Sequence, residues 1–263
     1  MNILTKILEQ KKIEVGALRE QPDPLATTTQ KQRVSLFETL RKANTLQVIS
    51  EMKRASPSKG MIAEGANPVA QAEIYAKAGA AAISVLTDKE FFKGSFEDLA
   101  VVADAVPTPL LCKDFIIDHV QIRFAKASGA SIVLLIVAAL EDEALHDLYS
   151  YATSLGLEVL VEVHDVKELE RAVAVGAKLI GVNNRDLRTF EVSLERTREI
   201  ADVFPFEEER VLISESGIWT NDHAKTVAFM GASAVLVGES LMRSGDAGKA
   251  LKSLQVLKAG LSI

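Results

Sequence analysis

Isolated polar side chains stand where short apolar runs of this sequence end. Lys113 follows Leu111 and Cys112, and Glu162 ends the run at 159–161. A charge at the end of a buried strand costs free energy unless it is paired or used. The residues in such positions are Glu51, Lys53, Lys113, Glu162, Asn183 and Glu215. Crowded carboxylates and ammonium groups push each other's pKa values apart, so the set predicts a pocket that holds a proton donor beside a proton acceptor.

Two glycine-containing segments indicate an anion site. The letters SESGI at 214–218 and VGES at 237–240 follow two further apolar runs. Gly217 and Gly238 would let backbone N–H groups approach a ligand, and we expect each to be followed by a helix whose N-terminus favours anions. Either glycine alone is equally well explained by a tight turn. The two together favour a phosphorylated substrate.

The elements that must position these residues alternate between strand and helix from Leu46 onward. Eight apolar runs predict strands at 48–52, 81–86, 109–113, 132–137, 159–163, 179–182, 211–214 and 234–237. Helical stretches such as 68–78 and 166–175 lie between them. Glycines stand at the expected helix ends: Gly79, Gly129, Gly156, Gly176 and Gly231.

Strands that are apolar on both faces indicate a parallel sheet. Eight of them favour an α/β fold, the closed (β/α)8 TIM barrel, over a doubly wound open sheet. A closed barrel gathers its strand ends around one axis, and the loops after its strands seven and eight are its usual phosphate cradle.

The N-terminal part of the chain has a different pattern. Apolar residues at helical spacing begin at Ile3, a break follows at 21–24, and a second helix is expected at 35–43. Two helices offer too little apolar surface to fold alone. We therefore expect residues 1–45 to form a helical extension packed on the barrel, 46–263, within one structural domain overall.

Strand parity separates the inward side chains from the outward ones. Alternate residues of a barrel strand face the interior, so Glu51 and Lys53 share a face, whereas Lys113 and Cys112 point opposite ways. If Lys113 faces the axis, Cys112 faces the helices and is structural. We expect His164 in a loop after the Glu162 strand. Surface positions are expected for the three other histidines, His119, His146 and His223.

Composition excludes several classes of protein. The 263 residues carry a net charge of −6, which disfavours nucleic acid and anionic membranes as partners. A single cysteine cannot form an internal disulfide, and no apolar run reaches the roughly 18 residues of a membrane span. No secretory signal, metal-ligand spacing or dinucleotide glycine motif is evident. We expect a cytoplasmic enzyme, a monomer without a stable partner, that needs no cofactor.

Several segments resemble the indole-3-glycerol phosphate synthase family. The segment VISEMKRASPS at 48–58 closely resembles the first-strand signature of that family. The segments that agree with the family in order are FKGS at 92–95, LCKDFI at 111–116, LVEVH at 160–164, GVNNRDL at 181–187 and SESGI at 214–218. The resemblance covers essentially the whole chain. It implies a (β/α)8 barrel with an N-terminal helical segment near its mouth and no cofactor.

The resemblance also implies a reaction. The family closes the indole ring of 1-(2-carboxyphenylamino)-1-deoxyribulose 5-phosphate, with loss of carbon dioxide and water, in tryptophan biosynthesis. Lys113 would protonate the sugar ketone oxygen, Lys53 would share that role and hold substrate anions, and Glu162 would act as the base. The other residues implied to be catalytic are Glu51, Asn183, Glu215 and Ser216.

Substrate-binding residues follow from the same resemblance. Those implied to contact the phosphate or other substrate groups are Lys53, Ser56, Arg185, Ser216, Gly217, Gly238 and Glu239. Those expected to wall the anthranilate ring are Pro57, Phe92, Phe115 and Leu134. An acidic side chain repels phosphate, so we expect Glu239 to point away while its backbone N–H serves.

Two other functions stay open on the sequence. One is a different phosphate-binding barrel enzyme, such as phosphoribosylanthranilate isomerase, for which a cysteine/aspartate acid–base pair would be expected. The other is a non-catalytic barrel that binds a phosphorylated metabolite. Degenerate enzymes usually lose their charged strand-end residues, whereas this chain has all of them.

Overall fold

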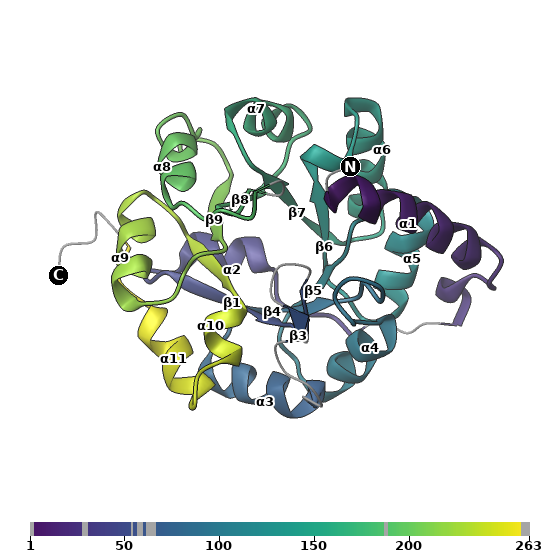
Figure 1. The fold of residues 1–263 in the computed structure, drawn as a ribbon, viewed down its shortest axis with the longest axis horizontal. Helices are drawn as coiled ribbons and strands as arrows, with labels where there is room; N and C mark the ends of the chain where they lie inside the picture. Colours follow the sequence, from purple (N-terminus) through teal and green to yellow (C-terminus); the bar gives the residue numbers. More distant parts are fainter. Residues whose placement is uncertain are drawn as a thin grey trace.

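The chain folds into a closed parallel barrel surrounded by helices (Figure 1). The computed structural model describes residues 3–27, 31–53, 55–56, 60–61, 67–186 and 189–258. The barrel strands are β1 (Gln47–Met52), β4 (Ala82–Leu86), β5 (Leu110–Lys113), β6 (Ile132–Ile136), β7 (Glu158–Val163), β8 (Leu179–Asn183), β9 (Val211–Glu215) and β10 (Ala234–Val237). They pair in chain order, and β1 closes the ring by pairing with both β4 and β10.

Helices alternate with these strands. The α-helices are α1 (Ile3–Arg19), α2 (Leu36–Lys42), α3 (Pro68–Ala78), α4 (Phe96–Ala105), α5 (His119–Ala127), α6 (Asp142–Ser154), α7 (Val166–Ala174), α8 (Glu195–Ala201), α9 (Asn221–Phe229), α10 (Glu239–Met242) and α11 (Ala247–Leu254). Two 3₁₀ turns, η1 (Pro24–Thr27) and η2 (Val137–Ala139), and a short hairpin of β2 (Ala55–Ser56) and β3 (Gly60–Met61) complete the elements of the described residues.

The predicted TIM barrel is therefore confirmed, and the open doubly wound sheet is wrong. Each of the eight predicted strands is present within one or two residues of its expected bounds. The five glycines expected at helix ends all have positive φ values, between 76° and 98°. Glycine adopts this left-handed conformation without a steric penalty, so these residues end one helix and turn the chain toward the next strand.

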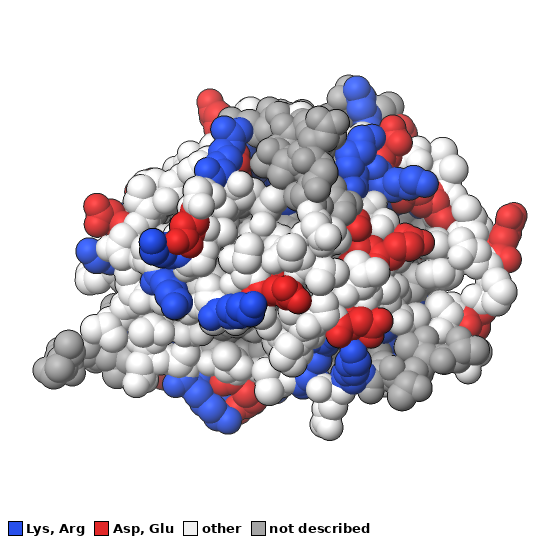
Figure 2. Space-filling model, turned by 90° about the horizontal axis from the view of Figure 1, so that it is seen from below, with Lys and Arg blue, Asp and Glu red and all other residues white. Residues whose placement is uncertain are grey.

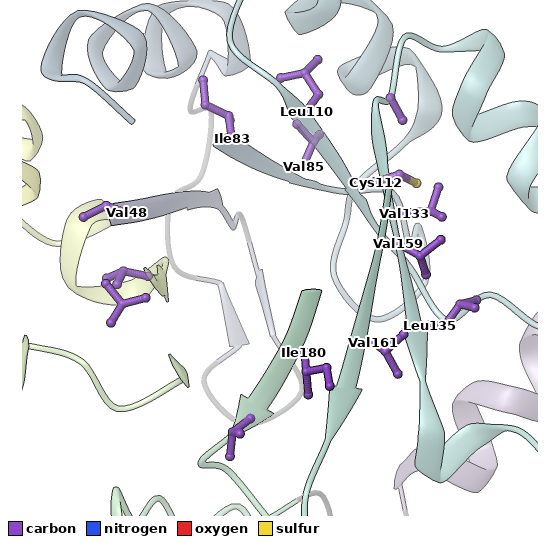
Figure 3. Packing of buried hydrophobic residues seen from close by; sticks show 14 of the residues in the cluster. Val48, Ile83, Val85, Leu110, Cys112, Val133, Leu135, Val159, Val161 and Ile180 are labelled. Atoms are coloured by element: carbon purple, nitrogen blue, oxygen red, sulfur yellow. The ribbon is translucent and has the colours of Figure 1, made fainter. Parts of the chain in front are cut away.

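Strand parity divides the core into an inner and an outer part. Leu111, Leu160 and Ile213 belong to the buried cluster inside the barrel. The alternate strand residues pack in the outer cluster between sheet and helices; Figure 3 shows part of it, including Cys112 and Val161. Two residues beyond Leu111, Leu160 and Ile213 the inward face turns polar, which places Lys113, Glu162 and Glu215 at the carboxyl end of the barrel.

Helix α2 closes the opposite end of the barrel. Its Leu36, Phe37 and Leu40 are buried in the inner cluster. The carboxylate of Glu158, the first residue of β7, accepts hydrogen bonds from the backbone N–H groups of Leu36 and Phe37 at 2.7 and 2.9 Å. A carboxylate at a helix N-terminus satisfies donors that the helix itself leaves free. The site can thus open at only one end of the barrel.

Charges of both signs are mixed on the face of the molecule that Figure 2 shows. In Figure 2 Lys and Arg side chains are interspersed with Asp and Glu over the face shown. Among the described residues no helix combines the length and apolarity needed to span a bilayer.

Helix α1 is fastened to the barrel by a buried lysine. Lys11 is 1% exposed, and its Nζ lies 2.8 Å from Asp88 Oδ2 and 2.7 Å from Asp114 Oδ1. Burial acts to lower the pKa of Lys11, but attraction to Asp114 and Asp88 outweighs it and raises the pKa. Asp114 directly follows β5, and Asp88 lies in the loop after β4. One ammonium group thus holds α1 against the carboxyl ends of two strands.

Substituting Lys11 with Ala should lower the free energy of unfolding by about 3–5 kcal/mol, because two buried carboxylates then face each other without a cation. Lys12→Ala, on the exposed side of the same helix, should change it by less than about 0.5 kcal/mol. Denaturant unfolding of the two variants checks this. Equal midpoints would show that the ion pairs of Lys11 with Asp88 and Asp114 do not stabilise the fold.

Candidate active site

The strand-end residues singled out in the sequence line one pocket at the mouth of the barrel. The members that reach this pocket are Glu51 and Lys53 from β1 and its end, Lys113 from β5, Glu162 from β7, Asn183 from β8 and Glu215 from β9. These residues come from five strands, and the parallel register brings their side chains together. The first residues of α1 cover the pocket with Ile3, Leu4 and Ile7.

Lys113 lies between two buried carboxylates. Its Nζ is 2.7 Å from Glu162 Oε2 and 3.2 Å from Glu215 Oε2, and each glutamate is only 2% exposed. Burial acts to lower the pKa of Lys113, but Glu162 and Glu215 outweigh it and raise the pKa, so the side chain is a firmly held ammonium.

The two glutamates differ in their affinity for a proton. Burial alone would raise the pKa of Glu162, but attraction to Lys113 lowers it to about 2. Burial raises the pKa of Glu215 to about 7, with Lys113 opposing and Glu162 adding to the shift. Near neutral pH the cluster therefore holds one ionised carboxylate, one carboxyl close to its titration point and one ammonium. Environment has separated two chemically identical side chains into different protonation states.

Glu215 leaves one oxygen without a partner. Among the described residues its Oε1 is buried and accepts no hydrogen bond. A Cβ at Gly181 would lie 2.0 Å from this oxygen, so only glycine leaves room for the carboxylate. An unpaired buried acceptor is costly unless a ligand group satisfies it, and Glu215 is one of the residues that line the pocket.

The second lysine is paired separately. Lys53 Nζ lies 2.8 Å from Glu51 Oε1 and is more exposed than Lys113. Glu51 packs against Gly238, where a Cβ would lie 2.9 Å from Glu51 Oε1 and 3.2 Å from its Cβ. The glycine after β10 is thus required by the close approach of the β1 carboxylate.

Asn183 connects the cluster to the loop after β9. Its Nδ2 donates to Glu162 Oε1 at 2.9 Å, and its Oδ1 accepts from Ser216 Oγ at 2.9 Å. Behind it the fully buried Asn184 donates to Ser214 Oγ and to the carbonyl oxygens of Glu215 and Ser216. These bonds fix the ends of β8 and β9 relative to each other.

The two glycine loops lie side by side at the pocket, but only one begins a helix there. Gly238 is the N-cap of the four-residue helix α10, as expected. Gly217 is also followed by a helix, as expected, but α9 begins only at Asn221 with Thr220 as its N-cap, so the helix N-terminus is not at the glycine itself. Ser216 and Gly217 instead have φ values of 66° and 80° and form a left-handed turn. Ser240 Oγ donates to Ile218 O at 3.0 Å and ties the loops together.

An apolar wall stands on another side of the pocket. The rings of Phe92 and Phe115 are 6.0 Å apart between centroids, and Leu134 lies with them in the pocket lining. Asp88 Oδ1 accepts the backbone N–H groups of Phe91 and Phe92 at 2.7 and 3.1 Å, which holds that turn. Pro57 and the side chain of Ser56 lie outside the described residues.

Arg185 and Glu239 stand at the edges of the pocket. Arg185 lines it, and its Nη1 donates to Phe190 O at 3.3 Å. Glu239 also lines it, and its Oε1 lies 3.1 Å from Arg243 Nη2, one helical turn further along the chain. The arginine neutralises an acidic group that would otherwise repel an anion at this place.

Sequence reasoning missed three parts of the site. It gave no partner to Lys11, Asp88 or Asp114, which anchor α1 and the aromatic turn. His164 was assigned only to a loop, yet it is 10% exposed and lies 3.4 Å from Glu162. His223 was expected at the surface, but its Nδ1 lies 3.1 Å from Gly217 O and supports that turn. For His164 the sequence did hold a signal: Glu168 stands four residues later, a spacing at which two side chains can pair.

Cys112 lies on the outer side of the barrel wall. Cys112 is fully buried in the outer cluster, as strand parity predicted, and burial raises the pKa of its thiol. Within the described ranges no three His, Cys, Asp or Glu side chains gather as metal ligands would. The pocket thus brings together ammonium groups, carboxylates, the two glycine loops and an apolar wall.

The raised pKa of Glu215 predicts a pH-dependent stability. Stability linked to this group is complete below its unfolded value, near 4.5, and is lost as pH rises toward 7. Glu215→Gln stays neutral, so the stability of the variant relative to wild type should increase between pH 5 and pH 8 by on the order of 1–3 kcal/mol. Denaturant titrations at both pH values measure this. A constant difference, or one that decreases with pH, would contradict the assignment.

Three comparisons place the chain among known proteins. The family model for indole-3-glycerol phosphate synthase matches residues 4–254. The chain is 49% identical over 259 residues to the indole-3-glycerol phosphate synthase of Exiguobacterium sibiricum, covering 98% of each chain. It is 50% identical over 260 residues to that of Listeria monocytogenes, covering 98% of this chain and all of the other.

Solved structures show the same fold at low identity. Thiamine phosphate pyrophosphorylase from Pyrococcus furiosus matches with a TM-score of 0.58 at 18% identity, over 80% of this chain and 93% of its own. The 3-hexulose-6-phosphate synthase of Salmonella typhimurium matches with a TM-score of 0.59 at 13% identity, over 80% and 98%. These two structures share the fold with this chain but little of its sequence. The family model and the relatives that are about 50% identical over nearly the whole length identify the family: the chain belongs to the indole-3-glycerol phosphate synthase family.

Proposed function

We propose that this chain catalyses the ring closure, decarboxylation and dehydration of 1-(2-carboxyphenylamino)-1-deoxyribulose 5-phosphate to indole-3-glycerol phosphate. Membership of the family supports the reaction. The observation that carries it in the structure is the Lys113–Glu162 pair, 2.7 Å apart, in a pocket that also holds the glycine loops and the aromatic wall.

The pocket suits the two ends of this substrate. Its phosphate would bind the backbone at Gly217 and Gly238, beside Ser216. Its anthranilate ring would pack on Phe92 and Phe115. A third contact with the ring, from Leu134, would keep it near the centre of the barrel. Holding both ends forces the ring and the sugar ketone together, and such positioning can supply several kcal/mol of the barrier, roughly 7–11 in the best intramolecular cases.

Lys113 would act first, as the acid. The ring carbon attacks the ketone carbon, and the ketone oxygen takes a proton as its negative charge develops. An ammonium held by Glu162 is well placed to donate it, and Lys53 would share this role and bind the substrate carboxylate. Decarboxylation follows. The bond between the ring carbon and the carboxylate carbon breaks, and its electron pair stays with the ring.

Glu162 would act last, as the base. The hydroxyl made in the first step takes a second proton from a lysine of the pocket and leaves as water, and Glu162 takes a proton from the neighbouring CH₂ group to complete the indole. Glu51, Asn183 and Glu215 would orient the lysines and the sugar hydroxyls, with Glu215 Oε1 free to accept one of them among the described residues. Arg185 and Ser56 would contact substrate anions, Pro57 the ring, and Glu239 would contribute its backbone N–H.

We also propose that the chain works as a monomer in the cytoplasm on this phosphorylated small molecule. Its net charge of −6 and its single cysteine support this. The isomerase alternative has less support. Its acid–base pair would need a cysteine in the pocket, whereas Cys112 is fully buried among the outward-facing residues.

The reaction and its acid and base can be tested together by the fluorescence of the indole product. Wild type should form it, whereas folded Lys113→Ala and Glu162→Gln should each lose about 10²–10⁴ in kcat, the usual contribution of a positioned acid or base. Lys225→Ala and Glu170→Gln, both exposed, are the matched controls and should keep the wild-type rate.

Loss of activity in the controls as well would point to damaged folding, so circular dichroism of all four variants accompanies the assay. Near-normal turnover in Lys113→Ala or Glu162→Gln would refute the role of that residue. No product from well-folded wild type would refute the proposed reaction.

A further inference from the structure

A histidine lies behind Glu162, on the side away from Lys113. The two carboxylate oxygens of Glu162 face different groups: Oε2 pairs with Lys113 Nζ, and Oε1 lies 3.4 Å from His164 Nε2. The His164 side chain is nine-tenths buried. Among the described residues its Nε2 has no hydrogen-bond partner of good geometry, so it is a buried polar atom directed toward Glu162.

The other ring nitrogen is held by Glu168 of α7. His164 Nδ1 lies 3.0 Å from Glu168 Oε2, and the same oxygen accepts the backbone N–H of His164 at 2.8 Å. Asp165 Oδ1 in turn accepts the backbone N–H of Glu168 at 2.9 Å as the N-cap of α7. A carboxylate accepts hydrogen bonds only, so Nδ1 must be the nitrogen that carries hydrogen.

This arrangement leaves one proton to be shared. If Nδ1 carries the only ring hydrogen, Nε2 presents a lone pair to an ionised carboxylate, and two acceptors face each other in a buried place. One further proton, on Nε2 or on Glu162 Oε1, turns that contact into a hydrogen bond. Burial acts to lower the pKa of His164, but Glu168, Glu162 and Glu215 outweigh it and raise the pKa. The ammonium of Lys113 faces the pair from β5, on the far side of Glu162.

The reaction proposed above consumes a proton. The ketone oxygen receives two protons before it leaves as water, and the CH₂ group gives up one. The electron pair of the bond to carbon dioxide stays with the ring, so no other proton is released. Each turnover therefore takes up one net proton, in a pocket that α1 covers.

We propose that His164, oriented by Glu168, stores with Glu162 the proton that each turnover consumes. The step rests on the proposed function. Once Lys113 has protonated the substrate oxygen, His164 Nε2 passes its proton to Oε1 of the ionised Glu162. The protonated carboxyl group then turns about its Cγ–Cδ bond and gives that same proton to Lys113 Nζ, which leaves His164 neutral and Glu162 ionised again. No other bond changes. After product release, water that enters the open pocket supplies a new proton to the His164–Glu162 pair. His164 acts through Glu162 and is a positioning residue.

Single-turnover kinetics with a pH-indicator dye tests the timing of proton uptake. In wild type, indole should form before a proton is taken up from bulk solvent. In His164→Gln the two should coincide, and the single-turnover rate should fall by roughly 10–100-fold with little change in KM. His146→Gln, an exposed histidine of α6, is the control and should match wild type in rate and timing.

The pH profile separates this role from a purely structural one. The pair must be protonated to act, so the wild-type single-turnover rate should fall as pH rises through the titration of His164. Glu168→Gln keeps the hydrogen bond but removes a negative charge, so this fall should move to lower pH. A profile unchanged in both Glu168→Gln and His164→Gln would overturn the proposal.

Nitrogen NMR of His164 gives a readout that does not depend on turnover. At pH 7 both ring nitrogens should be protonated in wild type, and Glu168→Gln should lower the pH at which Nε2 loses its proton. A ring with hydrogen on Nδ1 alone at pH 7, beside an ionised Glu162, would exclude the stored proton. Absence of product from wild type would instead count against the proposed reaction, which the NMR result does not require.

Discussion

The burial of Lys113 between Glu162 and Glu215 is the interaction on which the rest of the site depends. One ammonium neutralises one carboxylate at 2.7 Å and leaves the other, at 3.2 Å, with a raised pKa. Such a cluster is expensive to remove from water. It persists because three strands, β5, β7 and β9, deliver its members in fixed register, on top of an inner core of leucine and isoleucine side chains. The resulting imbalance in proton affinity is what acid–base chemistry requires.

Several features of the fold serve this cluster. Gly181 and Gly238 are the places where a side chain would collide with Glu215 and Glu51. Asn184 joins the ends of β8 and β9, and α2 closes the far end of the barrel, so solvent and substrate share one entrance. A second buried ammonium lies away from Lys113. Lys11 pairs with two aspartates and holds α1 over the pocket. Stability and site geometry are thus set by the same kind of buried ion pair.

The barrel and the central cluster could be predicted because both depend on local pattern. Apolar runs mark the strands, and a period of two places Lys113 inward and Cys112 outward. Contacts between distant segments have no such signal. Lys11 stands on an exposed-looking helix, and nothing near it in the sequence indicates Asp88 or Asp114. The left-handed turn after β9 has no local signal either, because Ser216 is a residue with a Cβ and adopts a φ of 66° that only the folded site imposes.

The most direct test of the account is a crystal structure with a substrate analogue whose ketone is reduced to an alcohol, so that it binds but cannot cyclise. We expect its phosphate at the backbone of Gly217 and Gly238, its ring against Phe92 and Phe115, and the alcohol oxygen within hydrogen-bonding distance of Lys113 Nζ. An analogue bound in the reverse orientation, or with Lys113 still paired only to its glutamates and out of reach of that oxygen, would contradict the account.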